Sequence, residues 1–283
     1  TGMNILLRIG SAANNMDDVM RRIAQEKLPT RNMMFCTDDK HIEDIRREGH
    51  INANARMAVA AGIDPIDAIK MASYNAARAY GIRGVGAIAP GYKADMVLLE
   101  DLKDFKVKRV ISRFGLPYTG EERLPSPLLP PQVFNSVRLP EISKESLALR
   151  CGANAPVIKM IPHQLVTELV YRDVERDENG CFIPGNGMVK LAVIERHHAT
   201  GSMGVGILEG LGISHGAVAS TVAHDSHNLV VAGDNDEDML MAIESLRECG
   251  GGYSVVSRGV VLSRLPLPIA GLMTAAPVND VLE

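Results

Sequence analysis

The stretch MMFCTDDKH, Met33 to His41, joins a short apolar run to two consecutive aspartates. The apolar run predicts a buried strand, and HIEDIRREG, residues 41–49, predicts the helix that follows it. Upstream, NILLRIG at residues 4–10 predicts another short strand. NNMDDVMRRIAQEKL at residues 14–28 has its apolar residues at helical spacing. This order of strand, helix, strand and helix is typical of a parallel α/β unit.

Further helices are predicted after this unit, in HINANARMAVAAG at residues 50–62 and in DPIDAIKMASYNAARAYG at residues 64–81. Asp64 is a suitable N-cap, and Pro65 suits the first helical position. From Gly84 to Gly115 short β-type runs alternate with turn residues, which predicts a small β module. The proline-rich stretch EERLPSPLLPPQVFN at residues 121–135 then predicts an extended connector.

The last part of the chain alternates strand and helix signals again. MVKLAVIERHHATG at residues 188–201 and GAVASTVAHDSHNLVVAG at residues 216–233 predict strands. NDEDMLMAIESLRECGG at residues 235–251 predicts a helix whose first residues form an acidic cap, and GYSVVSRGVVLSRLPLP at residues 252–268 predicts paired strands. A second domain is therefore expected after the connector.

The composition excludes several classes of function. The 283 residues are 46% hydrophobic and carry 30 basic against 34 acidic side chains. This balance gives no excess of positive charge that would favour nucleic acid or an anionic membrane, so a small ligand is expected instead. The four cysteines stand far apart, which argues against a disulfide scaffold or a zinc ribbon and favours a reducing cytoplasm. No apolar run approaches the length of a membrane span.

Asp38 and Asp39 are the first candidates for chemistry, because active-site groups gather at the carboxyl ends of strands in α/β barrels. Either aspartate could instead cap the helix that follows. A pair of aspartates allows one to cap while the other binds a divalent metal and moves a proton.

The segment GAIAPGYKADMVLLEDL, residues 86–102, resembles the segment by which amidohydrolase-superfamily enzymes leave their (β/α)8 barrel and enter a small β-sandwich. Together with FCTDDKH and the helical run from Arg47 to Ile82, it resembles one family, the adenine deaminases. VIERHHATG, GAVASTVAHDSHNLVVAGDNDEDM and LPLPIAGLM are similar to that family's C-terminal α/β domain. The resemblance covers nearly the whole chain.

The resemblance implies four parts. Residues 1–83 would be the last strands and helices of a metal-dependent hydrolase barrel, and residues 84–120 a β-sandwich segment. Residues 121–150 would form the connector, and residues 151–283 the C-terminal α/β domain. It also implies hydrolysis of adenine to hypoxanthine and ammonia by a metal-activated hydroxide. Manganese or iron, or alternatively zinc, would be the metal, with Asp38 as both metal ligand and proton carrier.

The chain departs from the family pattern in ways that affect its activity. A barrel of this kind needs roughly 250 residues, but only the residues before Gly84 are available, and no His-x-His pair precedes Asp38. A missing N-terminal part of the barrel, or a complementary chain, would have to supply the other ligands. We therefore expect the isolated chain to be inactive and to form homo-oligomers. Ile9 stands where an acidic residue is expected, and Ala76 where an Asn-Pro step is usual.

A second polar cluster lies in AHDSHN at residues 223–228. A tight turn could bring His224 and His227 together, and Glu195 and His197 could add metal ligands from another strand end. The alternative is that these histidines only satisfy backbone carbonyls. Weaker candidates for lining a substrate pocket are Asp39, His50, His198, Asp225 and Ser226.

Two other functions stay open. One is another cyclic amidohydrolase, such as a dihydropyrimidinase-like enzyme, because the barrel exit is shared across the superfamily. The other is a non-catalytic partner or assembly module, because the remaining metal ligands are missing. GSMGVGILEGLG at residues 201–212 does not match the G-x-G-x-x-G pattern, so a dinucleotide site is not expected.

Overall fold

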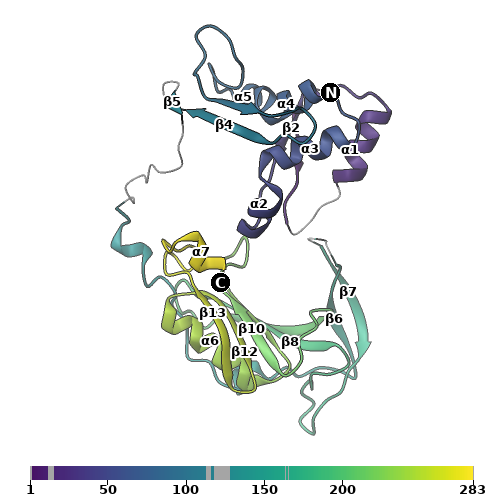
Figure 1. The fold of residues 1–283 in the computed structure, drawn as a ribbon. Coiled ribbons are helices and arrows are strands. Elements are labelled where there is room, and N and C mark those ends of the chain that lie inside the picture. The colour runs from purple at the N-terminus through teal and green to yellow at the C-terminus, as the bar shows by residue number, and fades with distance from the viewer. Residues whose placement is uncertain are drawn as a thin grey trace. The chain divides into compact units, whose positions relative to one another are not determined.

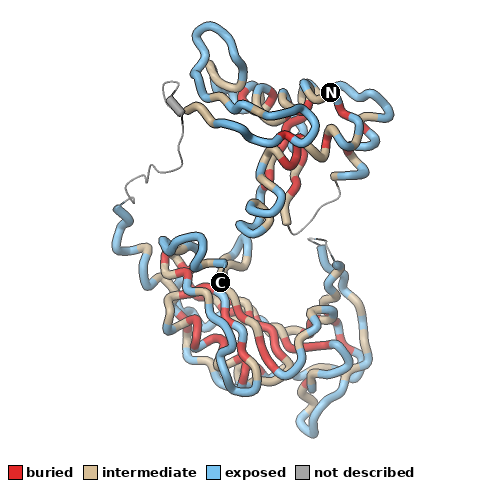
Figure 2. Tube along the Cα trace, viewed as in Figure 1, coloured by how far each residue is buried: buried red, intermediate tan, exposed pale blue. Residues whose placement is uncertain are grey.

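The computed structural model describes residues 2–11, 16–112, 116–117, 128–162, 164 and 166–282. These residues divide into two compact units, one before and one after the segment around residue 126 (Figure 1). Each unit has its own hydrophobic core, visible as the buried segments in Figure 2.

The N-terminal unit is built on a pair of parallel strands, β1 (Ile5–Arg8) and β2 (Met33–Cys36). Register pairs Arg8 with Cys36, so the carboxyl ends of both strands lie side by side. Five helices complete this α/β arrangement. They are α1 (Met16–Gln25), α2 (Ile42–Glu48), α3 (Ile51–Ala60), α4 (Pro65–Ala72) and α5 (Tyr74–Ala79).

The core of this unit explains why these segments form helices and strands. Leu7 and Phe35 from the strands pack with Met20 of α1 and Met71 of α4, and all four are buried. Asp64 caps α4 as predicted, because its carboxylate accepts hydrogen bonds from the Ile66 and Asp67 amides. The strand and helix positions predicted for residues 4–62 are thus confirmed.

A small antiparallel sheet follows in the same unit. Its strands are β3 (Met96–Leu99), β4 (Val107–Ser112) and β5 (Leu116–Pro117). This is the β module predicted from Gly84 onward. Part of the predicted connector, residues 121–127, lies outside the described residues, as do residues 118–120 before it. Downstream of it, Leu139 and Leu147 are buried in the core of the C-terminal unit, so this part of the connector packs on that unit.

The C-terminal unit contains one large mixed sheet of order β13-β12-β10-β11-β8-β9-β6-β7. All neighbours are antiparallel except β6 and β9, which are parallel. The strands are β6 (Asn154–Met160), β7 (Thr167–Asp173), β8 (Met188–Ile194), β9 (Met203–Glu209), β10 (Gly216–Ser220), β11 (Leu229–Gly233), β12 (Gly252–Ser257) and β13 (Val260–Pro266).

Helix α6 (Asp236–Cys249) lies along one face of this sheet, against β10, β11, β12 and β13 (Figure 1). Asn235 is its N-cap and accepts a hydrogen bond from the Asp238 amide. Gly250 ends the helix with φ of 78°, a left-handed conformation that glycine adopts without strain. The predicted helix with acidic first residues is confirmed, although the N-cap itself is Asn235. A short helix, α7 (Val278–Leu282), ends the described chain.

Two local expectations were wrong or incomplete. The single helix expected over residues 64–81 is two helices, because Ser73 leaves the helical conformation and its hydroxyl donates to the Ile69 carbonyl. The glycine-rich run at residues 201–212, for which no strand was expected, contains β9. No helix in the described part of the chain is long and apolar enough to cross a membrane.

Candidate functional site

The candidate catalytic groups lie where β1 and β2 end. Thr37 is buried just after β2, and Asp38 follows it with φ of 52°, in the left-handed region that aspartate enters more easily than most residues. The side chain of Asp38 is 59% exposed, so its carboxylate is accessible for binding. The cap position of the next helix, α2, belongs to His41, whose amide donates to Ser11 Oγ at 2.9 Å.

Arg8 holds both aspartates from the end of the neighbouring strand. Its Nε lies 3.1 Å from Asp38 Oδ2, and its Nη2 donates to Asp39 Oδ1 at 3.0 Å. The hydrogen bond to Asp39 raises the pKa of Arg8, so the guanidinium stays charged. Arg8 therefore holds Asp39 by a hydrogen bond, and its ion pair with Asp38 helps to balance the charge of the two carboxylates. Sequence reasoning did not assign this role, which depends on two segments about thirty residues apart.

Gly10 makes the close approach of Asp39 possible. A Cβ atom on Gly10 would lie 1.6 Å from Asp39 Oδ1 and 2.8 Å from its Cγ. Any larger residue would therefore displace Asp39 from its bond with Arg8. Sequence reasoning missed this requirement too, because a glycine after a strand is equally typical of a turn.

Hydrogen bonds tie the following helices to the same strand ends. Thr37 Oγ1 and His50 Nε2 share a hydrogen bond of 2.9 Å, which places His50 beside the two aspartates in this unit. Ser11 Oγ donates to Asp44 Oδ2 of α2 at 2.5 Å. The predicted candidates Asp38, Asp39 and His50 are thus brought together by the fold.

The burial of Ile9 explains why this position carries an apolar residue. The resemblance predicts an acidic residue here, but Ile9 is 2% exposed and belongs to the hydrophobic core of this unit. An ionised carboxylate would be costly in that position. The polar groups of the site are therefore Arg8, Asp38 and Asp39, and position 9 contributes only to the core.

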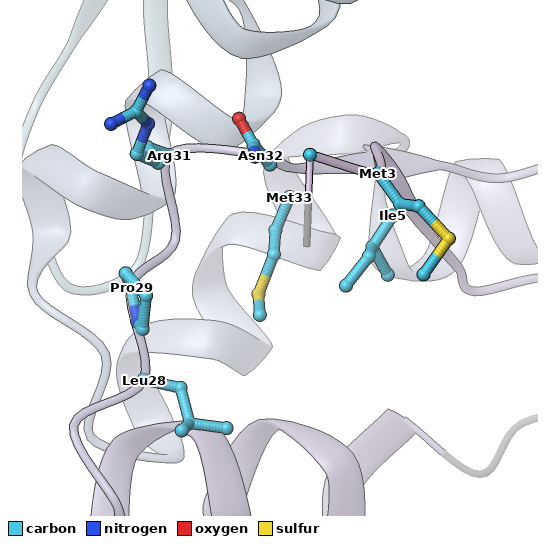
Figure 3. Close-up of a pocket in the computed structure, with 8 residues that line it drawn as sticks. Met3, Ile5, Leu28, Pro29, Arg31, Asn32 and Met33 are labelled. Carbon is cyan, nitrogen blue, oxygen red and sulfur yellow. The ribbon is translucent and has the colours of Figure 1, made fainter.

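A hollow in the N-terminal unit lies away from these groups. It has a volume of about 500 Å³ and opens at the amino ends of β1 and β2. Met3, Ile5, Leu28 and Met33 line it together with the loop residues before β2 (Figure 3). Because Asp38 follows the opposite ends of the strands, this hollow is not the candidate catalytic site.

In the C-terminal unit, a buried arginine joins the loops at one end of the sheet. Arg196 follows β8 and is 1% exposed. Its Nε donates to the His227 carbonyl at 2.5 Å, and its Nη2 donates to the Thr221 and Ala270 carbonyls at 3.2 and 3.1 Å. Burial lowers the pKa of Arg196 from its usual value. The guanidinium therefore serves as a structural cross-link between three loops.

Glu195 organises the loop that carries His197 and His198. Its Oε1 accepts hydrogen bonds from the amides of both histidines, and its Oε2 accepts from the Thr200 amide and hydroxyl. These bonds lower the pKa of Glu195 to about 2, with the Thr200 amide as the largest cause. The carboxylate that was predicted as a metal ligand thus has both oxygens engaged within its own loop.

Four of the five described histidines of the C-terminal unit form two pairs. The rings of His224 and His227 lie 5.7 Å apart in an edge-on arrangement, so the predicted turn does bring them together. His224 Nδ1 also pairs with the Asp225 carboxylate. The rings of His197 and His198 lie 6.4 Å apart, and His197 Nε2 donates to the Ser226 carbonyl at 3.0 Å.

The described residues do not assemble a metal centre by themselves. No group of three or more histidine, cysteine, aspartate or glutamate side chains in that part of the chain is placed to hold an ion. Asp38 is one accessible carboxylate, and His224 and His227 are one imidazole pair. The assignment of these residues as metal ligands stays a prediction, and we derive no step through a metal from the present geometry.

Comparison with known proteins gives matches to both units. Residues 11–120 match the amidohydrolase family, and residues 164–283 match the adenine deaminase C-terminal domain.

Curated relatives match along the whole chain. The adenine deaminase of Nitratidesulfovibrio vulgaris strain DP4 is 47% identical over 291 residues, which covers 100% of this chain and 49% of the relative. Adenine deaminase 2 of Carboxydothermus hydrogenoformans is 44% identical over 292 residues, with 100% and 50% covered. The adenine deaminase of Lysinibacillus sphaericus strain C3-41 is 42% identical over 289 residues, with 100% and 49% covered.

The chain spans about half the length of the curated relatives it matches. Its N-terminal unit carries the amidohydrolase match, and its C-terminal unit carries a domain that is named for adenine deaminases. Over its whole length the chain is therefore similar to about half of an adenine deaminase.

Proposed function

We propose that the intact protein containing this chain hydrolyses adenine to hypoxanthine and ammonia. The observation that carries this proposal is the 47% identity to an adenine deaminase over the full length of the chain. The geometry of the N-terminal unit supports it, because Asp38 stands accessible at a strand end where α/β enzymes place their active-site groups.

In the proposed reaction, water adds to the carbon of adenine that carries the amino group, and the bond from that carbon to the amino nitrogen then breaks. Asp38 takes a proton from the attacking water and delivers it to the leaving nitrogen, so that ammonia departs. Arg8 keeps a positive charge beside the Asp38 carboxylate, with its Nε 3.1 Å from Asp38 Oδ2. Asp39 occupies the other side of Arg8, while His50 and Thr37 border the same strand end.

We further propose that β1, β2 and their helices are the last part of a (β/α)8 barrel. The two parallel strands, with helices following each of them, support this assignment. The resemblance implies a divalent metal, manganese, iron or zinc, of which Asp38 would be one ligand. The remaining ligands and the rest of the barrel would come from other parts of the protein. We expect it to act in the cytoplasm.

Product analysis tests the proposed substrate. Purified intact protein, loaded with manganese, iron or zinc in separate samples, would be incubated with adenine, and hypoxanthine and ammonia would be quantified together. We expect the two products in equal amounts. Hydrolysis of a cyclic amide such as dihydrouracil, with no release of ammonia from adenine, would instead identify the protein as a ring-opening amidohydrolase.

A further inference from the structure

The eight-stranded sheet has two faces of different chemistry. Residues that pair directly across neighbouring strands point to the same face, so the register assigns each side chain to a face. Val256 packs in the core with α6, which defines the helix face, and its pairing with Ala217 and Val261 places those residues there too. Val255 and Val218 pair with each other on the opposite side, which we name the open face.

Charged side chains are concentrated on the helix face. The ion pairs Lys159–Glu168, Arg172–Glu209, Lys190–Asp236 and Arg264–Glu248 all involve strand residues on this face. Among the charged residues of strands β6 to β13, all of which are described, Asp173 alone lies on the open face, at the very end of β7 opposite Asn154.

The open face is mostly apolar, although Ser220, Ser257, Ser263 and Thr167 also lie on it. It is formed by Leu169, Tyr171, Ile158, Met160, Leu208, Val189, Leu191, Val193, Ala232, Val230, Val218, Tyr253, Val255 and Val260, together with small residues. Leu211 and Ile213 of the next loop pack against Val189, Leu208 and Ala232, which are buried, so this loop covers part of the face. Leu169, Tyr171 and Tyr253 are 70%, 62% and 46% exposed. An antiparallel sheet that faces water normally carries polar residues on that side, so this face is suited to a partner.

We propose that the open face packs against the open face of a second copy of this chain. A surface whose one strand charge, Asp173, lies at its edge is complementary to itself, and interfaces between identical subunits are the most apolar class. Eight strands about 4.8 Å apart, each with roughly 20 Å of length, give a face of on the order of 700 Å². Leu211 and Ile213 already cover a part of it, so the area left for a partner is smaller than the roughly 800 Å² per partner that a stable interface of standard size buries.

Two glycines give the open face a place to receive side chains from the partner. Gly204 and Gly206 of β9 pair with Val193 and Leu191 of β8 on this face. A Cβ atom added at either glycine would meet no atom within 4 Å. The two glycines therefore leave a shallow groove beside the Val193 and Leu191 side chains. Side chains from an opposing sheet can interdigitate in this groove, as in packed β-sandwiches.

Sedimentation of the intact protein tests this interface. Val255→Glu places a carboxylate on the open face, and Val261→Glu is the matched control, because both valines are 39% exposed and Val261 lies on the helix face. Leu169→Glu, at the other side of the open face, provides a second probe. We expect a wild-type dimer, an unchanged dimer for Val261→Glu, and dissociation constants raised at least about a hundredfold for the two open-face variants.

Circular dichroism and the urea midpoint of each variant separate loss of the dimer from loss of the fold. Monomeric Val255→Glu and Leu169→Glu with native spectra would support the proposal. A wild-type protein that sediments as a monomer would overturn it. Open-face variants that remain dimeric, or that lose stability without any change in mass, would also overturn it, since another part of the same polypeptide would then cover the face.

Discussion

Replacement of Arg196 by methionine should lower the free energy of unfolding of the C-terminal unit by several kcal/mol. Methionine keeps much of the apolar stem but removes the donors to the carbonyls of Thr221, His227 and Ala270. Leaving a buried acceptor without its donor costs about 1–3 kcal/mol, so three lost bonds would cost roughly 3–9 kcal/mol. Removal of a buried cation recovers part of its desolvation cost, which favours the lower end, about 3 kcal/mol.

Hydrogen exchange measured by mass spectrometry would follow this change in the C-terminal unit separately from the N-terminal unit. Amides of β8 and β11 should exchange about a hundredfold faster in Arg196→Met than in the wild type, as about 3 kcal/mol requires. Arg150→Met, which alters an exposed arginine of the same unit, is the control and should leave exchange unchanged. A change of less than threefold in Arg196→Met would refute the view that this side chain holds the loops together.

The remaining predictions concern two loops. Glu195→Gln should lower stability at pH 7, because the pKa of Glu195 is depressed to about 2. The ionised Glu195 carboxylate contributes its full stabilisation above the unfolded pKa near 4.5 and loses it as the pH falls toward 2. The urea midpoints of the wild type and the variant should therefore converge below pH 4.5. A difference between the midpoints that stays constant with pH would contradict this. Gly10→Ala should displace Asp39 from Arg8 and reduce adenine turnover by roughly tenfold to a hundredfold, whereas Gly185→Ala, where a Cβ meets open space, should not.

Much of the N-terminal unit was predictable because its signals are local. The apolar run before Asp38, the helical spacing after it and the cap at Asp64 each depend on a few neighbouring residues. The strand β9 was missed because Gly204 and Gly206 interrupt the apolar pattern by which strands are identified. Those glycines are acceptable in β9 because neighbouring strands hold the backbone in place through the sheet.

The site was only partly predictable, for a physical reason. Asp38, Asp39 and His50 could be found from their positions after a strand and at a helix start. The roles of Arg8 and Gly10 depend on contacts with residues about thirty positions away, and local patterns do not report these contacts. In the same way, the sequence suggested Glu195 as a ligand, whereas the folded loop engages both of its oxygens.

The measurement that tests the central claim most directly is adenine turnover by the intact protein and its Asp38→Asn variant. Asparagine keeps the size of the side chain but cannot carry the proton, so turnover should fall by about a hundredfold to ten-thousandfold while the circular dichroism spectrum stays the same. Asp67→Asn, at an exposed helical aspartate, should retain full activity. An Asp38→Asn variant as active as the wild type would contradict the assignment of this carboxylate as the proton carrier.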